Sequence, residues 1–412
     1  MILEYRCSNF KAIKEEVVFS MMASSDTSNS DYLLDFNNKK VNQVSSIYGA
    51  NGSGKTSLLE SMNFFKGLIL NGINQQPGDY IPINTHKLSK EDEPSEFILQ
   101  FVKNGIRYMY GISATKEKIV KEYLYHFPNK RPAKIFDREY EEYTFGKNFM
   151  SELKEALFKA KENRPFLSVA ANNTNIKEIE KVFLFFKEDI VVYLPDAINN
   201  WQEYSFNKIN SDKNLKRKVI NAFRSLGVNI NDIKTERHRI SFPEEMLEDL
   251  PIELRPILSD RAAEVNAVFL DYGDFMVSID DESSGVKKLF EVLCPIIDII
   301  ENDKILLWDE IENGLHDIIL HKLLQIFIKN KDSNAQLIFT THDINLLDLN
   351  ILRRDQIWFA ELEISNRQTE LYSLSEFKDI RKTENVSKNY INGRYGAIPF
   401  LKTNIQFKGG EE

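Results

Sequence analysis

One short stretch decides the fold of this chain: Gly49-Ala50-Asn51-Gly52-Ser53-Gly54-Lys55-Thr56. It matches the phosphate-binding loop pattern G-x-x-x-x-G-K-[ST] at every fixed position. Its glycines allow backbone angles that a Cβ atom would forbid, so that successive N–H groups can point at one anion. The stretch predicts a nucleotide-phosphate site in which Lys55 reaches the β- and γ-phosphates and the Thr56 hydroxyl binds Mg²⁺. The predicted nucleotide-binding residues of this loop are Gly49, Asn51, Gly52, Ser53, Gly54, Lys55, Thr56 and Ser57.

The flanks of the loop have the patterns of a strand and a helix. Residues 44–48 are a short run with β character, and residues 55–70 place apolar side chains at helical spacing. The N-terminus of such a helix carries a partial positive charge that favours phosphate. A chance glycine-rich turn is the alternative interpretation, and the two flanks argue against it.

The composition is that of a globular protein. The chain has 412 residues, of which 42% are hydrophobic and 28% charged, enough for two or three structural units. It has no apolar run of about 18 residues and no basic segment followed by an apolar stretch, so we expect neither a membrane span nor a signal peptide. Its two cysteines, Cys7 and Cys294, favour a reducing, cytoplasmic location.

The order of predicted elements indicates a split core. Residues 96–145 alternate as β-strands do, with a hairpin signal at residues 103–105. Residues 150–260 are mostly helical and charged. From residue 284 onward, helices and strands alternate, which is typical of a parallel α/β sheet. The helical middle is therefore predicted to be an insertion between two halves of one nucleotide-binding core.

An acidic strand supplies the partner that such a loop requires. Residues 304–308 are a predicted buried strand, and Asp309 and Glu310 follow at its carboxyl end, where ligands bind in open α/β sheets. Asp309 is the predicted Mg²⁺ residue and acts through the ion's water shell. Glu310 is the predicted general base for the attacking water. The alternative is a buried strand that ends in an acidic loop without a role in binding. The presence of the glycine loop argues against this alternative.

Two further segments narrow the class. Ser283 and Gly285 form a turn that opens a helix, and such a turn is another anion site. Residues 336–341 form a predicted buried strand that ends at His342, where an imidazole can contact a γ-phosphate. Taken singly, a helix cap for Ser283 and a structural role for His342 are the better interpretations. Their order and spacing favour the functional ones.

This series of motifs resembles the ATP-binding cassette (ABC) class of ATPase heads. Its details look most like the stand-alone OLD/RecF-like ATPases of bacterial phage-defence operons, of the RloA and AbiL type. The matching segments are residues 9–11, 282–285, 309–316, 353–359 and 392–399. The sequence departs from the family at Ile311 and Asp317, where proline is usual, and at Val286, where a polar residue is usual.

The resemblance implies an α/β fold: an ABC/SMC-type P-loop ATPase head, with a mixed sheet, an antiparallel β lobe and a helical insertion. The predicted segments are residues 1–149 (first half of the core with the P-loop and β lobe), 150–263 (helical insertion or lid), 264–375 (second half of the core) and 376–412 (C-terminal tail). The second half contains the turn at Ser283 and Gly285, which corresponds to the family's signature motif, together with the acidic strand and His342.

The resemblance also implies a site shared between chains. One ATP with Mg²⁺ would bind Lys55 and Thr56 of one chain and Ser283 and Gly285 of another, which makes a homodimer or higher homo-oligomer held by ATP. Lys11 is a further expected nucleotide contact. The expected catalytic residues are Lys55, Glu310 and His342.

Three functions stay open. The first is a defence ATPase that controls a separately encoded effector, a toxin or nuclease, because about seventy residues after His342 are few for another catalytic domain. The second is a DNA-repair ATPase of the RecF/SMC kind, for which basic clusters at residues 213–224 and 234–239 could follow a phosphate backbone. The third is an interaction module that binds ATP without turnover. The net charge of −9 favours the first over the second.

Overall fold

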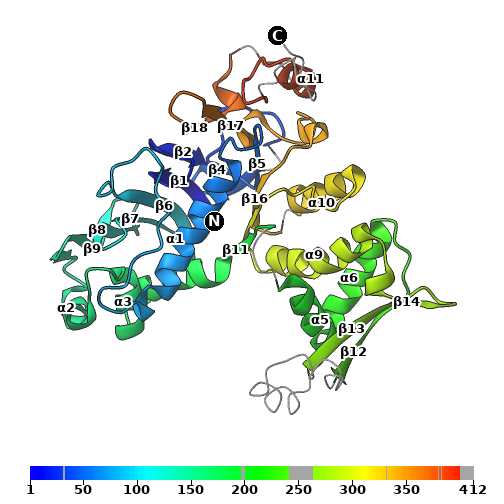
Figure 1. Cartoon of the computed structure of the whole chain (residues 1–412), viewed down its shortest axis with the longest axis horizontal. Helices are drawn as coiled ribbons and strands as arrows, with labels where there is room; N and C mark the ends of the chain where they lie inside the picture. The colour runs from blue at the N-terminus through cyan, green and yellow to red at the C-terminus, as the bar shows by residue number, and fades with distance from the viewer. Residues whose placement is uncertain are drawn as a thin grey trace, which may run out of the picture. The chain divides into compact units, whose positions relative to one another are not determined.

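The computed structural model describes residues 1–30, 33–195, 200–240, 263–330, 332–378, 380, 381 and 383–399. The chain folds into two compact units (Figure 1). The first comprises Met1–Pro195, Asn302–Glu312 and Leu323–Glu412, and the second comprises Asp196–Glu301 and Asn313–Lys322. Within the described ranges, no helix combines the length and apolarity that a bilayer span requires.

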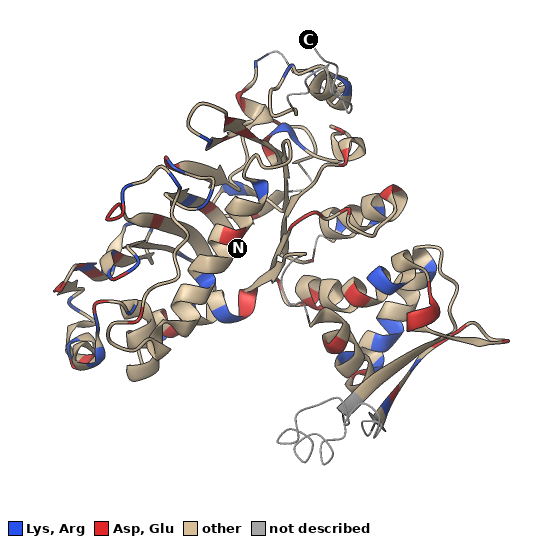
Figure 2. Ribbon diagram, in the orientation of Figure 1, with Lys and Arg blue, Asp and Glu red and all other residues tan. Residues whose placement is uncertain are grey.

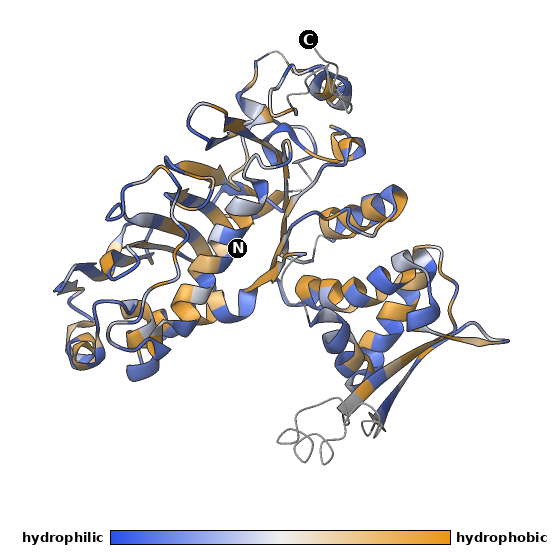
Figure 3. Ribbon diagram, in the orientation of Figure 1, coloured by the Kyte–Doolittle hydropathy of each residue, from blue (hydrophilic) through white to orange (hydrophobic). Residues whose placement is uncertain are grey.

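A six-stranded sheet forms the centre of the first unit. Its strands, in spatial order, are β11 (Ile190–Tyr193), β15 (Ile305–Trp308), β16 (Gln336–Thr340), β5 (Val44–Tyr48), β17 (Ile357–Glu363) and β18 (Gln368–Ser373). All neighbouring pairs are parallel except β17 with β18. Every residue of β5, β15 and β16 is buried, as expected of parallel strands covered on both faces, and Figure 3 shows the central strands as hydrophobic.

A seven-stranded antiparallel sheet is the second layer of this unit. Its strands, in spatial order, are β10 (Glu142–Phe145), β9 (Ala133–Glu139), β8 (Ile119–Phe127), β7 (Ile106–Ala114), β6 (Ser95–Lys103), β1 (Ile2–Ser8) and β2 (Val17–Ser20). Helix α1 (Lys55–Asn71) packs against it through Phe65, whose ring stacks on Phe97 and Tyr110. Because α1 also begins at the glycine loop, this aromatic contact anchors the loop to the β lobe.

The remaining elements of the first unit surround these sheets. They are β3 (Leu33–Phe36), β4 (Lys39–Asn42), α2 (Met150–Ala156), α3 (Phe166–Asn173), α4 (Lys177–Leu184), α11 (Val386–Ile391) and the C-terminal part of α10 (Asp317–Lys329).

The second unit combines helices with a small antiparallel sheet. Its helices are α5 (Trp201–Ser211), α6 (Lys213–Ser225) and α9 (Ser284–Glu301), and its strands are β12 (Asp232–Ile240), β13 (Ala263–Asp271) and β14 (Met276–Ser278). Helix α9 packs on α5 and α6 with a buried face that includes Leu289, Leu293 and Ile296. The apolar face of α9 therefore belongs to this unit.

The predicted fold class is confirmed: the protein is α/β, with a mixed sheet and an antiparallel β lobe. The middle of the chain is less uniform than the sequence suggested, because β11 and β12 interrupt its helices. The predicted segments 1–149, 150–263, 264–375 and 376–412 stay a prediction. Residues 400–412 of the predicted tail lie outside the described residues.

A buried ionic network holds the β lobe together. The Glu122 carboxylate accepts hydrogen bonds from the Tyr110 hydroxyl and from the N–H groups of Phe166 and Leu167 at the start of α3. The Arg138 guanidinium lies 3.7 Å from this carboxylate, and both side chains are at most 1% exposed. Breaking a buried pair from one side is costly because the other charge is left behind.

We predict that Glu122→Ala lowers the free energy of unfolding by about 3–5 kcal/mol, because it uncaps α3 and leaves Arg138 buried without its carboxylate. Urea denaturation followed by circular dichroism measures the change. The exposed Glu117→Ala, in the same lobe, should change it by less than about 0.5 kcal/mol. Equal losses in the two variants would contradict the prediction.

Candidate functional site

The glycine loop joins β5 to α1 and fits tightly against β17 and β18. A Cβ atom at Gly49 would lie 2.3 Å from the carbonyl oxygen of Ala360, and one at Gly54 would lie 2.0 Å from Thr369 Oγ1. Gly54 also has a φ of 99°, which favours glycine. Both glycines are therefore required by the close approach of β17 and β18.

Ser53 connects the loop to β18 and leaves one polar atom, its hydroxyl, without a partner. Its backbone carbonyl accepts a hydrogen bond of 3.0 Å from the Thr369 hydroxyl, which ties the loop to β18. Its own hydroxyl is buried and has no hydrogen-bond partner in the described structure. An unpartnered buried hydroxyl is costly unless a ligand or water completes it, which fits a site that binds a polar group.

Lys55 is the first residue of α1, and its side chain folds back over the loop. The ammonium donates to the carbonyl oxygens of Gly49 at 2.9 Å and Ala50 at 3.0 Å. Burial lowers the pKa of Lys55 to about 8, although the carboxylates of Asp309 and two neighbouring glutamates act to raise it. The ammonium is thus placed at the loop and is poorly solvated, so that a phosphate would be a favourable partner.

Asp309 brings the loop and the acidic strand together. Its carboxylate accepts hydrogen bonds from the Thr56 hydroxyl at 2.9 Å and from the Thr340 hydroxyl at 2.5 Å. A hydroxyl and a carboxylate are hard oxygen ligands, and Mg²⁺ typically takes one or two protein carboxylates together with substrate phosphates. Thr56 and Asp309, the two residues predicted for Mg²⁺, therefore lie together and fit that ion.

Glu310 occupies a constrained position directly after Asp309. Its φ is 52°, a left-handed value that is uncommon outside glycine and costs about 1–3 kcal/mol. Its N–H donates to the Thr340 hydroxyl at 2.8 Å, which holds this turn against β16. Backbone strain of this kind concentrates at functional sites.

His342 follows β16 and lies in the same electrostatic environment as Lys55, Asp309 and Glu310. Burial lowers the pKa of its imidazole, the Lys55 ammonium lowers it further, and the carboxylates of Glu312, Glu310 and Asp309 oppose this. Its backbone N–H donates to Glu312 Oε1 at 2.6 Å, and Glu312 is a site residue that the sequence did not predict.

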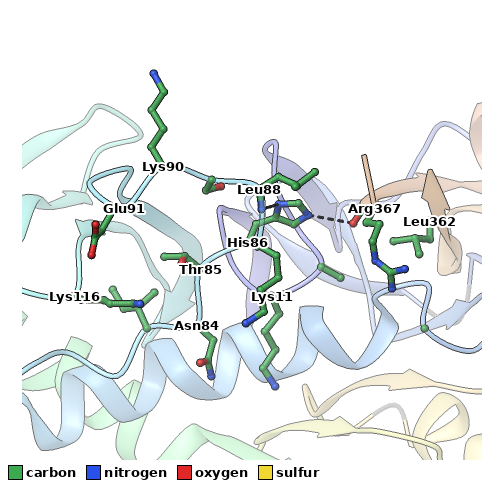
Figure 4. Close-up of a pocket in the computed structure, with 15 residues that line it drawn as sticks. Lys11, Asn84, Thr85, His86, Leu88, Lys90, Glu91, Lys116, Leu362 and Arg367 are labelled. Carbon is green, nitrogen blue, oxygen red and sulfur yellow. Dashed lines mark hydrogen bonds between the residues drawn. The ribbon is translucent and has the colours of Figure 1, made fainter. Parts of the chain in front are cut away.

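A cavity of about 730 Å³ borders the loop at Gly52 (Figure 4). Lys11 lines it, and the Lys11 ammonium also forms an ion pair of 2.5 Å with Glu60 on α1. Its role as a nucleotide contact stays a prediction. Lys116 and Arg367 are further cations in the lining, and neither was predicted. The cavity is therefore continuous with the loop and favours negatively charged or polar groups.

His86 holds one wall of this cavity. The buried imidazole accepts a hydrogen bond from the Leu88 N–H at Nδ1, so its proton lies on Nε2 and faces the carbonyl oxygen of Arg367 at 3.2 Å. This pair joins the loop before β6 to the turn between β17 and β18. No sequence motif marks His86, because its partner lies far along the chain.

Ser283 and Gly285 belong to the second unit, where they begin α9. The Ser283 hydroxyl accepts a hydrogen bond of 3.4 Å from the Val286 N–H, which is the helix-capping role weighed as an alternative. Ser283 remains exposed, and the atom nearest to a Cβ at Gly285 would be the Gly314 carbonyl oxygen at 3.9 Å. Both residues are accessible to a ligand, and their role toward one stays a prediction.

Residues 44–348 match the family model described as "AAA domain, putative AbiEii toxin, Type IV TA system". The chain belongs to this family. The match begins with β5 and contains the glycine loop, the acidic strand and His342, whereas Lys11, β17, β18 and Arg367 lie outside it. No curated protein matches this AAA domain protein.

Solved structures of SMC head domains are similar to the AAA protein at low scores. A head bound to the C-terminal winged-helix domain of ScpA has a TM-score of 0.45 at 12% identity, over 90% of this chain and 97% of that one. The SMC head domain from Thermotoga maritima has a TM-score of 0.43 at 12% identity, over 90% and 98%. A Pyrococcus furiosus head with an extended coiled coil, bound to the C-terminal domain of ScpA, has a TM-score of 0.39 at 12% identity, over 90% and 96%. Similarities of this size carry no argument about activity or partners.

We predict that affinity for ATP falls about tenfold per pH unit above pH 8, because binding requires the Lys55 ammonium and its pKa is about 8 in the unliganded protein. Titration calorimetry with a non-hydrolysable ATP analogue between pH 7 and 10 measures this. The exposed Lys154→Met should keep the same pH dependence. An affinity that is constant across this range would contradict the prediction.

Proposed function

We propose that this protein binds ATP with Mg²⁺ and hydrolyses it. One observation carries the proposal: the Thr56 hydroxyl of the glycine loop meets the Asp309 carboxylate of the acidic strand at 2.9 Å. Two motifs more than 250 residues apart in sequence thus meet at one point. Membership of an AAA family supports the same function.

The proposed roles follow from the contacts. The loop N–H groups and Lys55 bind the β- and γ-phosphates, and Lys11 with the adjoining cavity receives the rest of the nucleotide. Thr56 and Asp309 would hold Mg²⁺, which neutralises phosphate charge when bound. Glu310 accepts a proton from water as the water oxygen bonds to the γ-phosphorus and the bond to the leaving ADP oxygen breaks. The His342 imidazole donates a hydrogen bond to the γ-phosphate.

We further propose that each ATP lies between two copies of the chain. Ser283 and Gly285 of a second copy would contact the nucleotide held by Lys55 and Thr56 of the first, in a homodimer or higher homo-oligomer. The exposed start of α9 supports this, since backbone N–H groups at a helix N-terminus favour a phosphate.

The proposed cellular role is control of a separately encoded effector, a toxin or nuclease, in antiphage defence. The family description names a putative toxin and a type IV toxin–antitoxin system, which supports a partner of that kind. The closer resemblance to OLD/RecF-like ATPases of the RloA and AbiL type supports the same proposal. A cytoplasmic location follows from this role.

A DNA-repair ATPase of the RecF/SMC kind is the alternative function. The basic clusters that could bind DNA in such a protein largely form ion pairs within the second unit. Lys216 pairs with Asp232 at 2.7 Å, and Lys218 pairs with Glu301. Figure 2 shows Lys and Arg beside Asp and Glu on the elements of this unit. Paired cations release few counterions on binding DNA, so the clusters favour the effector proposal. DNA-stimulated ATP hydrolysis would reverse this preference, and tight ATP binding without turnover would favour an interaction module.

We predict that Glu310→Gln retains ATP binding, hydrolyses ATP at least about 100-fold more slowly and accumulates as an ATP-bound dimer, because it removes the base alone. Phosphate release measures turnover, and light scattering with ATP and Mg²⁺ measures the dimer. Lys55→Ala is the control and should lose nucleotide binding. Turnover by Glu310→Gln at the wild-type rate would show that another residue is the base.

We also predict complementation between two inactive variants. Lys55→Ala and Ser283→Arg should each be inactive alone, and an equal mixture should regain about a quarter of the wild-type rate, because half of the dimers contain one intact site of two. Phosphate release from the mixture measures this. A mixture as inactive as its components would contradict a shared site.

A further inference from the structure

The loop that follows the acidic strand contains a second glutamate, Glu312, which none of the proposed roles uses. Three hydrogen bonds connect this loop with the end of β16: Glu310 N–H to Thr340 Oγ1 at 2.8 Å, Ile311 N–H to the Thr340 carbonyl oxygen at 3.1 Å, and His342 N–H to Glu312 Oε1 at 2.6 Å. The third is made by an ionisable side chain and reaches the residue proposed to contact the γ-phosphate. It therefore links the segment that carries the proposed base to the segment that carries the histidine.

The surroundings of Glu312 are unusual for a purely structural contact. Its second oxygen, Oε2, is buried and has no hydrogen-bond partner in the described structure. The same is true of Asp343 Oδ2 and of the Tyr48 hydroxyl, which interacts electrostatically with both carboxylates. A donor and two acceptors thus interact electrostatically without pairing by hydrogen bonds. Leaving buried polar atoms unpaired costs about 1–3 kcal/mol each, so packing alone does not account for this cluster.

The position of this cluster connects it to the nucleotide loop. Tyr48 is the last residue of β5 and directly precedes Gly49. Lys55 interacts electrostatically with Glu312 as well as with Asp309 and Glu310. Glu312 therefore interacts electrostatically with Lys55 of the phosphate-binding loop and accepts a hydrogen bond from the backbone of His342.

We propose that Glu312 is a positioning residue for hydrolysis: its carboxylate holds the backbone of His342 and so sets where the imidazole meets the γ-phosphate. This role rests on the proposed ATP hydrolysis. Glu312 acts through His342 and touches no reacting atom. Displacement of a catalytic group by about 1 Å can cost about 100-fold in rate, so a single hydrogen bond is enough to have a large effect.

The test compares Glu312→Ala with Glu312→Gln. Glu312→Ala removes the acceptor, and we expect kcat for ATP to fall about 10–100-fold while KM changes less than about threefold. Glu312→Gln keeps an amide oxygen that can accept the His342 N–H, and we expect it to retain kcat within about threefold of wild type. Amide hydrogen exchange of the segment around His342 should speed up in Glu312→Ala and not in Glu312→Gln.

The exposed Glu370→Ala is the matched control and should leave kcat, KM and hydrogen exchange unchanged. Full activity in Glu312→Ala, or an equal loss of kcat in Glu312→Gln and Glu312→Ala, would overturn the positioning role. A wild-type protein that binds ATP but does not hydrolyse it would overturn the proposed function, and this role with it. The wild-type rate of ATP hydrolysis distinguishes the two failures. Hydrolysis is absent if the proposed function is wrong and present if only the positioning role is wrong.

Discussion

The carboxylate of Asp309 is the interaction on which the rest of the site depends. It is 3% exposed and accepts hydrogen bonds from Thr56 at the start of α1 and from Thr340 at the end of β16. A buried charge is tolerated only when such partners surround it. Because the partners come from distant parts of the chain, this one side chain fixes α1, β15 and β16 relative to one another at the carboxyl ends of the strands.

Several strained or unpaired groups lie near this point, and packing elsewhere in the fold compensates for them. Glu310 has a left-handed backbone, and the oxygens of Ser53, Glu312 and Asp343 include buried atoms without partners. The β lobe has a stacked aromatic core around Phe65 and a buried carboxylate, that of Glu122, both of whose oxygens accept hydrogen bonds. A domain can keep a costly site when the rest of the fold stabilises it.

The two units divide the proposed chemistry between them. The glycine loop, the acidic strand and His342 lie in the first unit, and Ser283 and Gly285 lie in the second. If ATP binds between two copies, each copy supplies both kinds of surface, and the interface is self-complementary. Nucleotide binding and assembly would then be one event, which suits a protein that controls a partner.

The sequence by itself determined the glycine loop, its flanking strand and helix, and the pair Asp309-Glu310 at the end of an apolar run, because each of these signals is local. It also indicated the α/β class through alternating helices and strands. It did not indicate β11, because the short run Ile190–Tyr193 lies inside a segment that otherwise has a helical pattern. Only the tertiary structure decided that Thr340 and Glu312 connect the acidic loop to His342, and that His86 holds the cavity wall. Those contacts depend on which strands are neighbours in the sheet and on how distant loops meet, and no spacing along the chain encodes either.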